Sequence, residues 1–327
     1  MNNRRKLVVA FGASVFAAPF ASSAQQQGKV WRIGVLWERA QSDPNYVRRI
    51  DAFRAGMREL GYSEDRHYIF LPRFAQNDFA RLPALAAELL ELKCDVILAA
   101  GTPAAIAARD GAHGIPILIM TAGNPVGTGL AATLSRPGGR VTGLSQDVGS
   151  DLYTKRLDLL RQLLPDMRRV GFLFNPDNAG DVLTLGQFES DCKKLGFQSI
   201  RAPARKREEI ATAFNILRRE KAQGLIVGPV LWPENVIEQA AKLRLPAIYG
   251  TAYPVELGGL ISYTADQIDL YRRAAAYADK IFKGAKPGDL PIEQPIKFET
   301  IINLKTAKAL GIKMPDVIML RADKVIE

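Results

Sequence analysis

The sequence has 327 residues, of which 47% are hydrophobic, and a formal charge of +10 from 44 basic and 34 acidic residues. This length exceeds what one hydrophobic core usually supports, so we expect two domains. The basic residues are interspersed with Glu and Asp, which is typical of a solvated surface, and we expect no nucleic-acid partner.

The first 24 residues have the pattern of a secretory signal peptide. Residues 4–6 are basic, residues 7–20 are uncharged and mostly apolar, and Ser22 and Ala24 are the small residues of a cleavage site. The apolar stretch is too short for a transmembrane helix. We expect cleavage after Ala24 and export to the periplasm, with the general and the twin-arginine routes both open.

From residue 30 onward, short apolar runs alternate with amphipathic segments, which predict strands and helices respectively. In the first series, a helix is also expected to begin at Pro103, with Thr102 before it. The other expected elements of this series are strands over residues 30–37, 68–74, 95–100, 115–121 and 141–145, and helices over residues 45–60, 79–92 and 125–134.

The same alternation of apolar runs and amphipathic segments then repeats in a second series. Near-continuous apolar strands separated by helices predict parallel sheets covered on both faces, so two series predict two doubly wound α/β lobes. The expected elements of the second series are strands over residues 170–174, 198–202, 224–227 and 247–249, and helices over residues 151–164, 181–195, 208–221 and 234–243.

The C-terminal section departs from this alternation. A long helix over residues 267–283 precedes a proline-punctuated extended stretch, which predicts a chain that returns to its first lobe and leaves it again. We expect lobe I to comprise residues 29–147 and 264–287, and lobe II residues 148–263 and 288–327, with hinge crossovers and a ligand cleft between them.

The two cysteines and two histidines lack the spacing of metal ligands, so we expect no metal and no cofactor. Cys94 and Cys192 lie in apolar elements of different expected lobes, and two separate buried thiols are therefore favoured over a disulfide.

Catalytic motifs are missing from the sequence. It contains no G-x-S-x-G elbow, no G-x-x-x-x-G-K-[ST] loop and no G-x-G-x-x-G fingerprint. We therefore expect a binding protein rather than an enzyme and assign no catalytic residue. An exported α/β enzyme such as a hydrolase, or a ligand-sensing domain, stays open as the alternative.

The loops at the carboxyl ends of the strands are the expected ligand-binding elements, because open α/β sheets bind ligands there. Thr102 opens a helix, so it is an N-cap, a seat for an anionic group, or both. The aromatic residues are either ligand-stacking surfaces or packing. The candidate ligand-binding residues are Trp37, Thr102, Asn124, Ser145, Asn175, Pro229, Tyr249, Tyr253 and, at the start of the returning helix, Asp266.

Five segments of the chain resemble one family: residues 135–143 (SRPGGRVTG), 258–263 (GGLISY), 271–275 (YRRAA), 284–295 (GAKPGDLPIEQP) and 302–311 (INLKTAKALG). The chain resembles the bacterial ABC-transporter substrate-binding proteins of the tryptophan/tyrosine-binding type over essentially its whole mature length. The resemblance implies a periplasmic binding protein class I fold, with three crossovers and the ligand in the cleft.

The resemblance also implies a role: an exported monomeric receptor that hands a small-molecule ligand to ABC-transporter permease subunits. Many relatives read Asp-Pro-Val where this chain has Asn124-Pro125-Val126, which argues against an amino-group contact at position 124. We expect an amino acid or a related carboxylate as the cargo, aromatic ones first. Sugars are the alternative, because aromatic residues with Asn and Asp also suit them.

Overall fold

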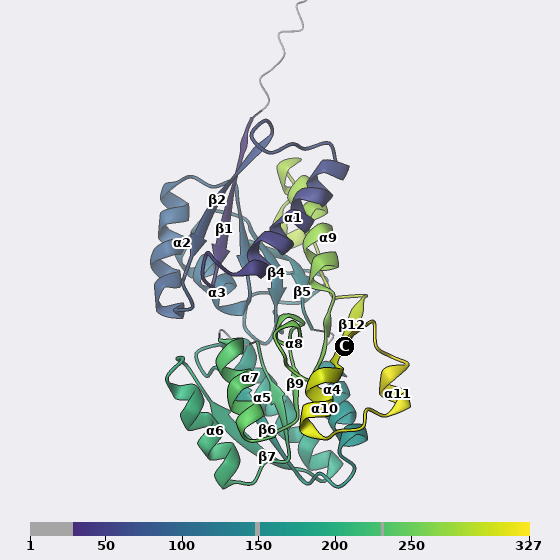
Figure 1. Cartoon of the computed structure of the whole chain (residues 1–327). Helices are drawn as coiled ribbons and strands as arrows, with labels where there is room; N and C mark the ends of the chain where they lie inside the picture. The colour runs from purple at the N-terminus through teal and green to yellow at the C-terminus, as the bar shows by residue number, and fades with distance from the viewer. Residues whose placement is uncertain (1–28, 148–150, 230–231) are drawn as a thin grey trace, which may run out of the picture.

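The computed structural model describes residues 29–147, 151–229 and 232–327, which form two α/β lobes joined by crossing segments (Figure 1). The expected signal peptide at residues 1–24 lies outside the described residues. In the described ranges, no helix is long and apolar enough to cross a membrane.

Lobe I contains a six-stranded sheet, in which every pairing is parallel, in the order β11-β5-β4-β3-β1-β2. Helices α1 and α9 cover one face of the sheet, and α2 and α3 cover the other, which explains why its central strands are apolar throughout. The elements are β1 (Trp31–Trp37), α1 (Pro44–Glu59), β2 (Tyr68–Phe74), the 3-10 turn η1 (Phe79–Arg81), α2 (Leu82–Glu91), β3 (Val96–Ala100), α3 (Thr102–Gly111), β4 (Ile117–Ala122), β5 (Val141–Ser145), α9 (Gln267–Phe282), the 3-10 turn η2 (Pro287–Asp289) and β11 (Ile292–Glu293).

Lobe II contains a seven-stranded sheet in the order β13-β12-β10-β9-β8-β6-β7, parallel except where β12 runs antiparallel to β10. Two apolar clusters cover its faces, so the predicted pair of doubly wound lobes is confirmed. The elements are α4 (Asp151–Leu163), β6 (Arg169–Phe174), α5 (Ala179–Leu195), β7 (Gln198–Pro203), α6 (Glu209–Arg219), β8 (Gly224–Val227), α7 (Pro233–Lys242), β9 (Ala247–Tyr249), α8 (Tyr253–Glu256), β10 (Ile261–Ala265), β12 (Phe298–Asn303), α10 (Leu304–Leu310), α11 (Asp316–Met319) and β13 (Lys324–Ile326).

The helix expected over residues 125–134 is wrong. This segment consists of turns, in which the Thr128 N–H donates to the Asn124 carbonyl and the Leu130 N–H to the Pro125 carbonyl. Gly129, within this segment, has a φ of +71°, which a continuous right-handed helix does not allow.

The lobe boundary expected after Pro287 lies later in the structure. Helix α9 packs against α1 in lobe I, as expected for the returning segment. Ile292 then pairs with Gly143 of β5, and the Ile292 N–H donates to the Leu134 carbonyl, so the chain stays with lobe I to Glu293. A two-residue edge strand between prolines carries no periodicity that the sequence could reveal.

The close contact of α1 with α9 depends on Gly56. A Cβ at this position would overlap the carbonyl oxygen of Arg272 and lie 2.8 Å from the Cβ of Ala275. We expect Gly56→Ala to lower the free energy of unfolding by about 1–3 kcal/mol, as overpacking does, in urea denaturation. The matched control is Gly186→Ala in α5, where nothing lies within 4 Å, and it should change stability by less than about 1 kcal/mol or raise it. Equal losses in both variants would contradict the contact.

Cys94 in lobe I and Cys192 in lobe II are both free and buried, which confirms the expectation of two separate thiols. Burial raises the pKa of Cys94 to about 11 and that of Cys192 to about 12. Neither thiol is therefore reactive while its lobe is folded.

Candidate functional site

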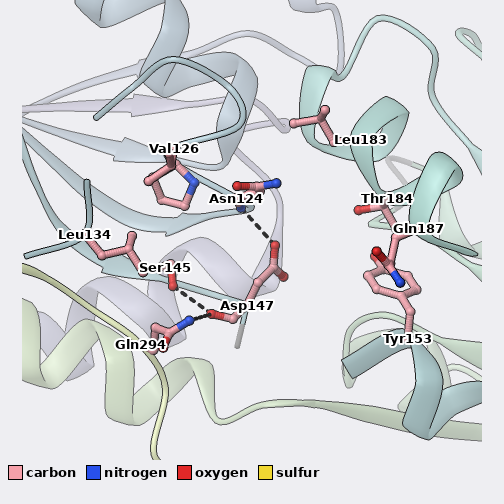
Figure 2. Close-up of a pocket in the computed structure, with 11 residues that line it drawn as sticks. Asn124, Val126, Leu134, Ser145, Asp147, Tyr153, Leu183, Thr184, Gln187 and Gln294 are labelled. Atoms are coloured by element: carbon pink, nitrogen blue, oxygen red, sulfur yellow. Dashed lines mark hydrogen bonds between the residues drawn. The ribbon is translucent and has the colours of Figure 1, made fainter. Parts of the chain in front are cut away.

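A pocket of about 240 Å³ lies between the two lobes (Figure 2). Asn124, Ser145 and Asp147 lie on one side of it, and Tyr153, Thr184 and Gln187 of lobe II lie opposite. Apolar side chains from both lobes and one amide complete the lining: Pro125, Val126, Leu134, Leu183 and Gln294.

Asp147 is the acidic group of this pocket, directly after the end of β5. Its Oδ2 accepts from the Asn124 N–H at 2.9 Å, and its backbone carbonyl accepts from Ser145 Oγ at 3.0 Å and Gln294 Nε2 at 3.2 Å. Burial raises the pKa of this carboxyl to about 6, against the opposing effects of the Asn124 N–H and the Arg156 charge. Within the described ranges, no Lys, Arg or His forms an ion pair with it.

The lobe II wall comes from helices α4 and α5 rather than from strand ends. Tyr153 lies in the first turn of α4, and Arg156 follows it, with its guanidinium carbon 4.6 Å from the Tyr153 ring centroid. Gln187 of α5 is oriented by Asp191, whose carboxylate accepts from its amide at 2.9 Å. The pocket is complete only when these helices face lobe I.

The two lobes are in contact beside the pocket. A Cβ on Gly180 of α5 would lie 3.0 Å from Oγ1 of Thr102 in lobe I. Arg48 on α1 pairs with Glu256 on α8 at 2.9 Å, and Lys324 holds the other Glu256 oxygen at 3.1 Å. The cleft is therefore closed in this structure.

Two further carboxyl groups lie at this contact. Glu38 follows β1, and its carboxylate lies against Gly101 at the start of α3. Asp181 of α5 accepts from the Asn175 N–H at 3.0 Å and from Asn178 Nδ2 at 3.2 Å. Burial raises the pKa of Glu38 to about 7 and that of Asp181 to about 8, and the charges of Glu38 and Asp147 add to the second shift. We call Glu38, Asp147 and Asp181 the carboxyl cluster.

A buried cation lies beside this cluster. Arg156 is only 2% exposed; its Nε donates to the Tyr263 carbonyl at 2.9 Å and its Nη2 to the Gly250 carbonyl at 3.3 Å. Among the residues that the structure describes, its Nη1 has no hydrogen-bond partner, and neither does Glu38 Oε2. Buried charged groups are normally paired, so a donor and an acceptor of opposite charge are both available here.

Among the residues expected from the sequence, Asn124 and Ser145 line the pocket. Thr102 does not cap α3, because Gly101 is the N-cap and Thr102 Oγ1 accepts from the Gly123 N–H at 3.0 Å. Since the Glu38 carboxylate lies against this helix start, the expected anion seat at Thr102 is wrong.

The expected stacking role of Trp37 and Tyr249 is also wrong. Trp37 is 1% exposed in the lobe I core, where it packs edge-on against Tyr46 and Tyr271. Tyr249 is 1% exposed in the lobe II core and lies outside the interlobe pocket. Each is the last residue of an apolar strand, so packing against the covering helices buries it.

The four other candidates lie apart from the main pocket. Tyr253 begins α8 and borders a smaller interlobe cavity with Arg48, whereas Asn175 and Pro229 line a small cavity within lobe II. Asp266 is the N-cap of α9, and its Oδ1 accepts from the Asp269 N–H at 3.0 Å. Its carboxylate therefore caps the helix.

Sequence reasoning missed Asp147, Arg156 and Asp181 as site residues. Asp147 follows a strand end closely enough for the strand-end rule to have included it. The other two lie on helices, and no spacing in the sequence marks them. Tyr153, Thr184 and Gln187 were missed for the same reason.

Two α/β lobes with a closed cleft between them have the periplasmic binding protein class I fold. The chain belongs to the ABC transporter substrate binding protein family, whose model matches residues 40–326. The predicted family and its receptor role are thereby confirmed.

Individual relatives agree with this assignment. A tyrosine-binding protein of Clostridioides difficile (strain R20291) is 26% identical over 276 residues, which cover 83% of this chain and 78% of the relative. A Streptococcus pneumoniae ABC domain in complex with L-Trp is 24% identical, with a TM-score of 0.83 over 91% of this chain and 100% of that one. The ligand-free, open structure of a Clostridium difficile substrate binding protein is 26% identical, with a TM-score of 0.66 over 91% of this chain and 99% of that one.

Proposed function

We propose that this protein is an exported receptor that binds a zwitterionic amino acid, aromatic ones first, and delivers it to an ABC importer. The observation that carries the proposal is the presence of opposite charges at one closed cleft: the buried Arg156 guanidinium, and the carboxyl group of Asp147, whose pKa its charge lowers. A ligand with a carboxylate and an ammonium supplies a partner to each.

The pocket suits the rest of such a molecule. Asp147 reaches the pocket from lobe I without an ion-pair partner in the described ranges, so it is the group we assign to the ammonium. Arg156 Nη1, next to Tyr153, is assigned to the carboxylate. The apolar walls at Val126, Leu134 and Leu183 then receive the side chain of the ligand. The tyrosine-binding relative and the L-Trp complex support an aromatic side chain.

The remaining parts of the proposal follow from the receptor role. We propose a monomer that is exported to the periplasm by the signal peptide at residues 1–24, interacts with permease subunits, and has no enzymatic activity and no nucleic-acid partner. Closure of the lobes over the ligand, with Arg48 and Glu256 in contact, produces the form that the permease distinguishes from the open one.

A thermal-shift screen of the mature protein tests the cargo. A ligand at 100 times its Kd adds about 2.7 kcal/mol of stability, which raises the melting temperature measurably. We expect L-tryptophan, L-tyrosine or L-phenylalanine to raise it. Tryptamine, which lacks the carboxylate, and indole-3-propionate, which lacks the ammonium, should not do so at the same concentration. Shifts by sugars alone would refute the amino-acid assignment, and chemical turnover of the bound ligand would refute the receptor role.

A further inference from the structure

A further cavity, of about 340 Å³, lies in lobe II on the side of its sheet covered by α7. Its walls are α7, α10 and the loop that joins α8 to β10, and its floor includes Ala247 and Tyr249 of β9. No residue of the interlobe pocket contributes to it. Small side chains leave the space open: Ala240 and Ala241 on α7, and Ala309 on α10.

The rim of this cavity is held in place. Thr306 Oγ1 of α10 donates to the Gly258 carbonyl at 2.8 Å, and the Gly259 N–H donates to the Pro254 carbonyl at 2.8 Å. A Cβ on Gly259 would lie 2.6 Å from the Tyr249 ring, so only glycine allows the ring to lie where it does. The Gly258-Gly259 pair, which the cleft does not use, thus shapes this cavity.

Tyr249 brings a polar group into these apolar surroundings. Its side chain is 1% exposed and lines the cavity, and its hydroxyl makes no hydrogen bond with any described residue. Two cations, Arg244 and Lys305, lie at the edge, and their side chains form no ion pair within the described ranges. A tyrosine and two unpaired cations around one apolar cavity favour a ligand with an anionic head group and an apolar body.

We propose that this cavity is a second small-molecule site, which takes an amphipathic anion: a medium-length aliphatic chain or a ring with a carboxylate. The apolar part lies against Leu245, Leu260 and the alanines, and the carboxylate accepts from the Tyr249 hydroxyl near Arg244 and Lys305. The site is independent of the amino-acid receptor role, because it lies within lobe II alone.

Calorimetric titration of the full mature chain with octanoate, and with octylammonium as a probe of equal length and opposite charge, tests the site. We expect octanoate to bind once per chain with an affinity that falls as salt is added, and octylammonium not to bind. Tyr249→Phe should weaken octanoate binding about tenfold, which is typical for loss of a hydrogen bond to a charged group. Lys305→Glu should weaken it at least about threefold, and Lys308→Glu, on the same helix outside the cavity, should not.

A substitution that fills the cavity tests whether octanoate binds inside it. Ala309→Phe should abolish octanoate binding with an unchanged melting temperature, because Ala309 is exposed at the mouth. Ala211→Phe, at an exposed position of α6, is the matched control and should bind octanoate normally. Equal binding of the two probes, no octanoate binding at all, or binding that survives Ala309→Phe would each overturn the proposal.

Discussion

Asp147→Asn is expected to weaken binding of the amino acid at least about 30-fold. Removing one partner of a buried charge pair costs about 2 kcal/mol or more, which corresponds to this factor. Asparagine has the same shape and keeps an oxygen that can accept from the Asn124 N–H, so the cleft geometry is preserved. Because burial raises the pKa of Asp147 to about 6, its charge is unfavourable without a ligand near neutral pH. The unliganded variant should therefore melt no lower than the parent.

Titration calorimetry and thermal unfolding of the same samples check this separation of binding from folding. Asp166→Asn, at an exposed position in the loop before β6, is the matched control and should bind with the parent affinity. An unchanged Kd in Asp147→Asn would remove Asp147 from the site. A loss of affinity accompanied by a lower melting temperature would give it a structural role instead.

Binding of the amino acid is expected to release protons and to become tighter as the pH rises from about 5 to about 8. In the closed cleft, Glu38, Asp147 and Asp181 have pKa values raised to about 7, 6 and 8. They therefore hold protons at pH values where free carboxyls do not. An ammonium group among them favours the ionised forms and lowers these pKa values, so binding expels protons.

The charged groups nearby are accounted for in this expectation. Arg39 and Arg49 lower the pKa of Glu38, and Arg156 lowers that of Asp147, but burial outweighs these three charges; Asp43 acts with burial and raises the pKa of Glu38. The unliganded protein should show the opposite trend in stability. Since the folded state binds more protons than the unfolded state between about pH 4 and 8, its free energy of unfolding falls as the pH rises through this window.

Calorimetry in two buffers with different ionisation enthalpies counts the protons directly. The double variant Glu38→Gln/Asp181→Asn should release fewer protons than the parent. Proton uptake on binding, or a heat that is identical in both buffers, would show that the carboxyl cluster does not respond to the ligand.

The fold was largely predictable from the sequence, because it depends on local patterns. Continuous apolar runs marked the central strands of both sheets, and the long helix after β10 marked the return to lobe I. The patterns failed where local signals were weak or ambiguous. The turns after Asn124 had apolar residues at helical spacing, and β11 is too short to show any periodicity.

The site was less predictable, because it forms between segments that meet only through tertiary structure. The strand-end rule gave Asn124 and Ser145, and both residues line the pocket. It could not give Thr184 or Gln187, which line the pocket from a helix of the opposite lobe. Aromatic type alone did not distinguish a residue that packs, such as Trp37, from one that lines the pocket, such as Tyr153.

The distribution of the two cysteines has a practical consequence. Each lobe contains one buried thiol, and neither thiol has a disulfide partner. A thiol reagent therefore modifies Cys94 only when lobe I opens locally and Cys192 only when lobe II does. Mass spectrometry of the two cysteine-containing peptides then yields two separate opening rates from one labelling experiment on the native sequence. The protein thus carries its own pair of reporters for whether its halves unfold together or in turn.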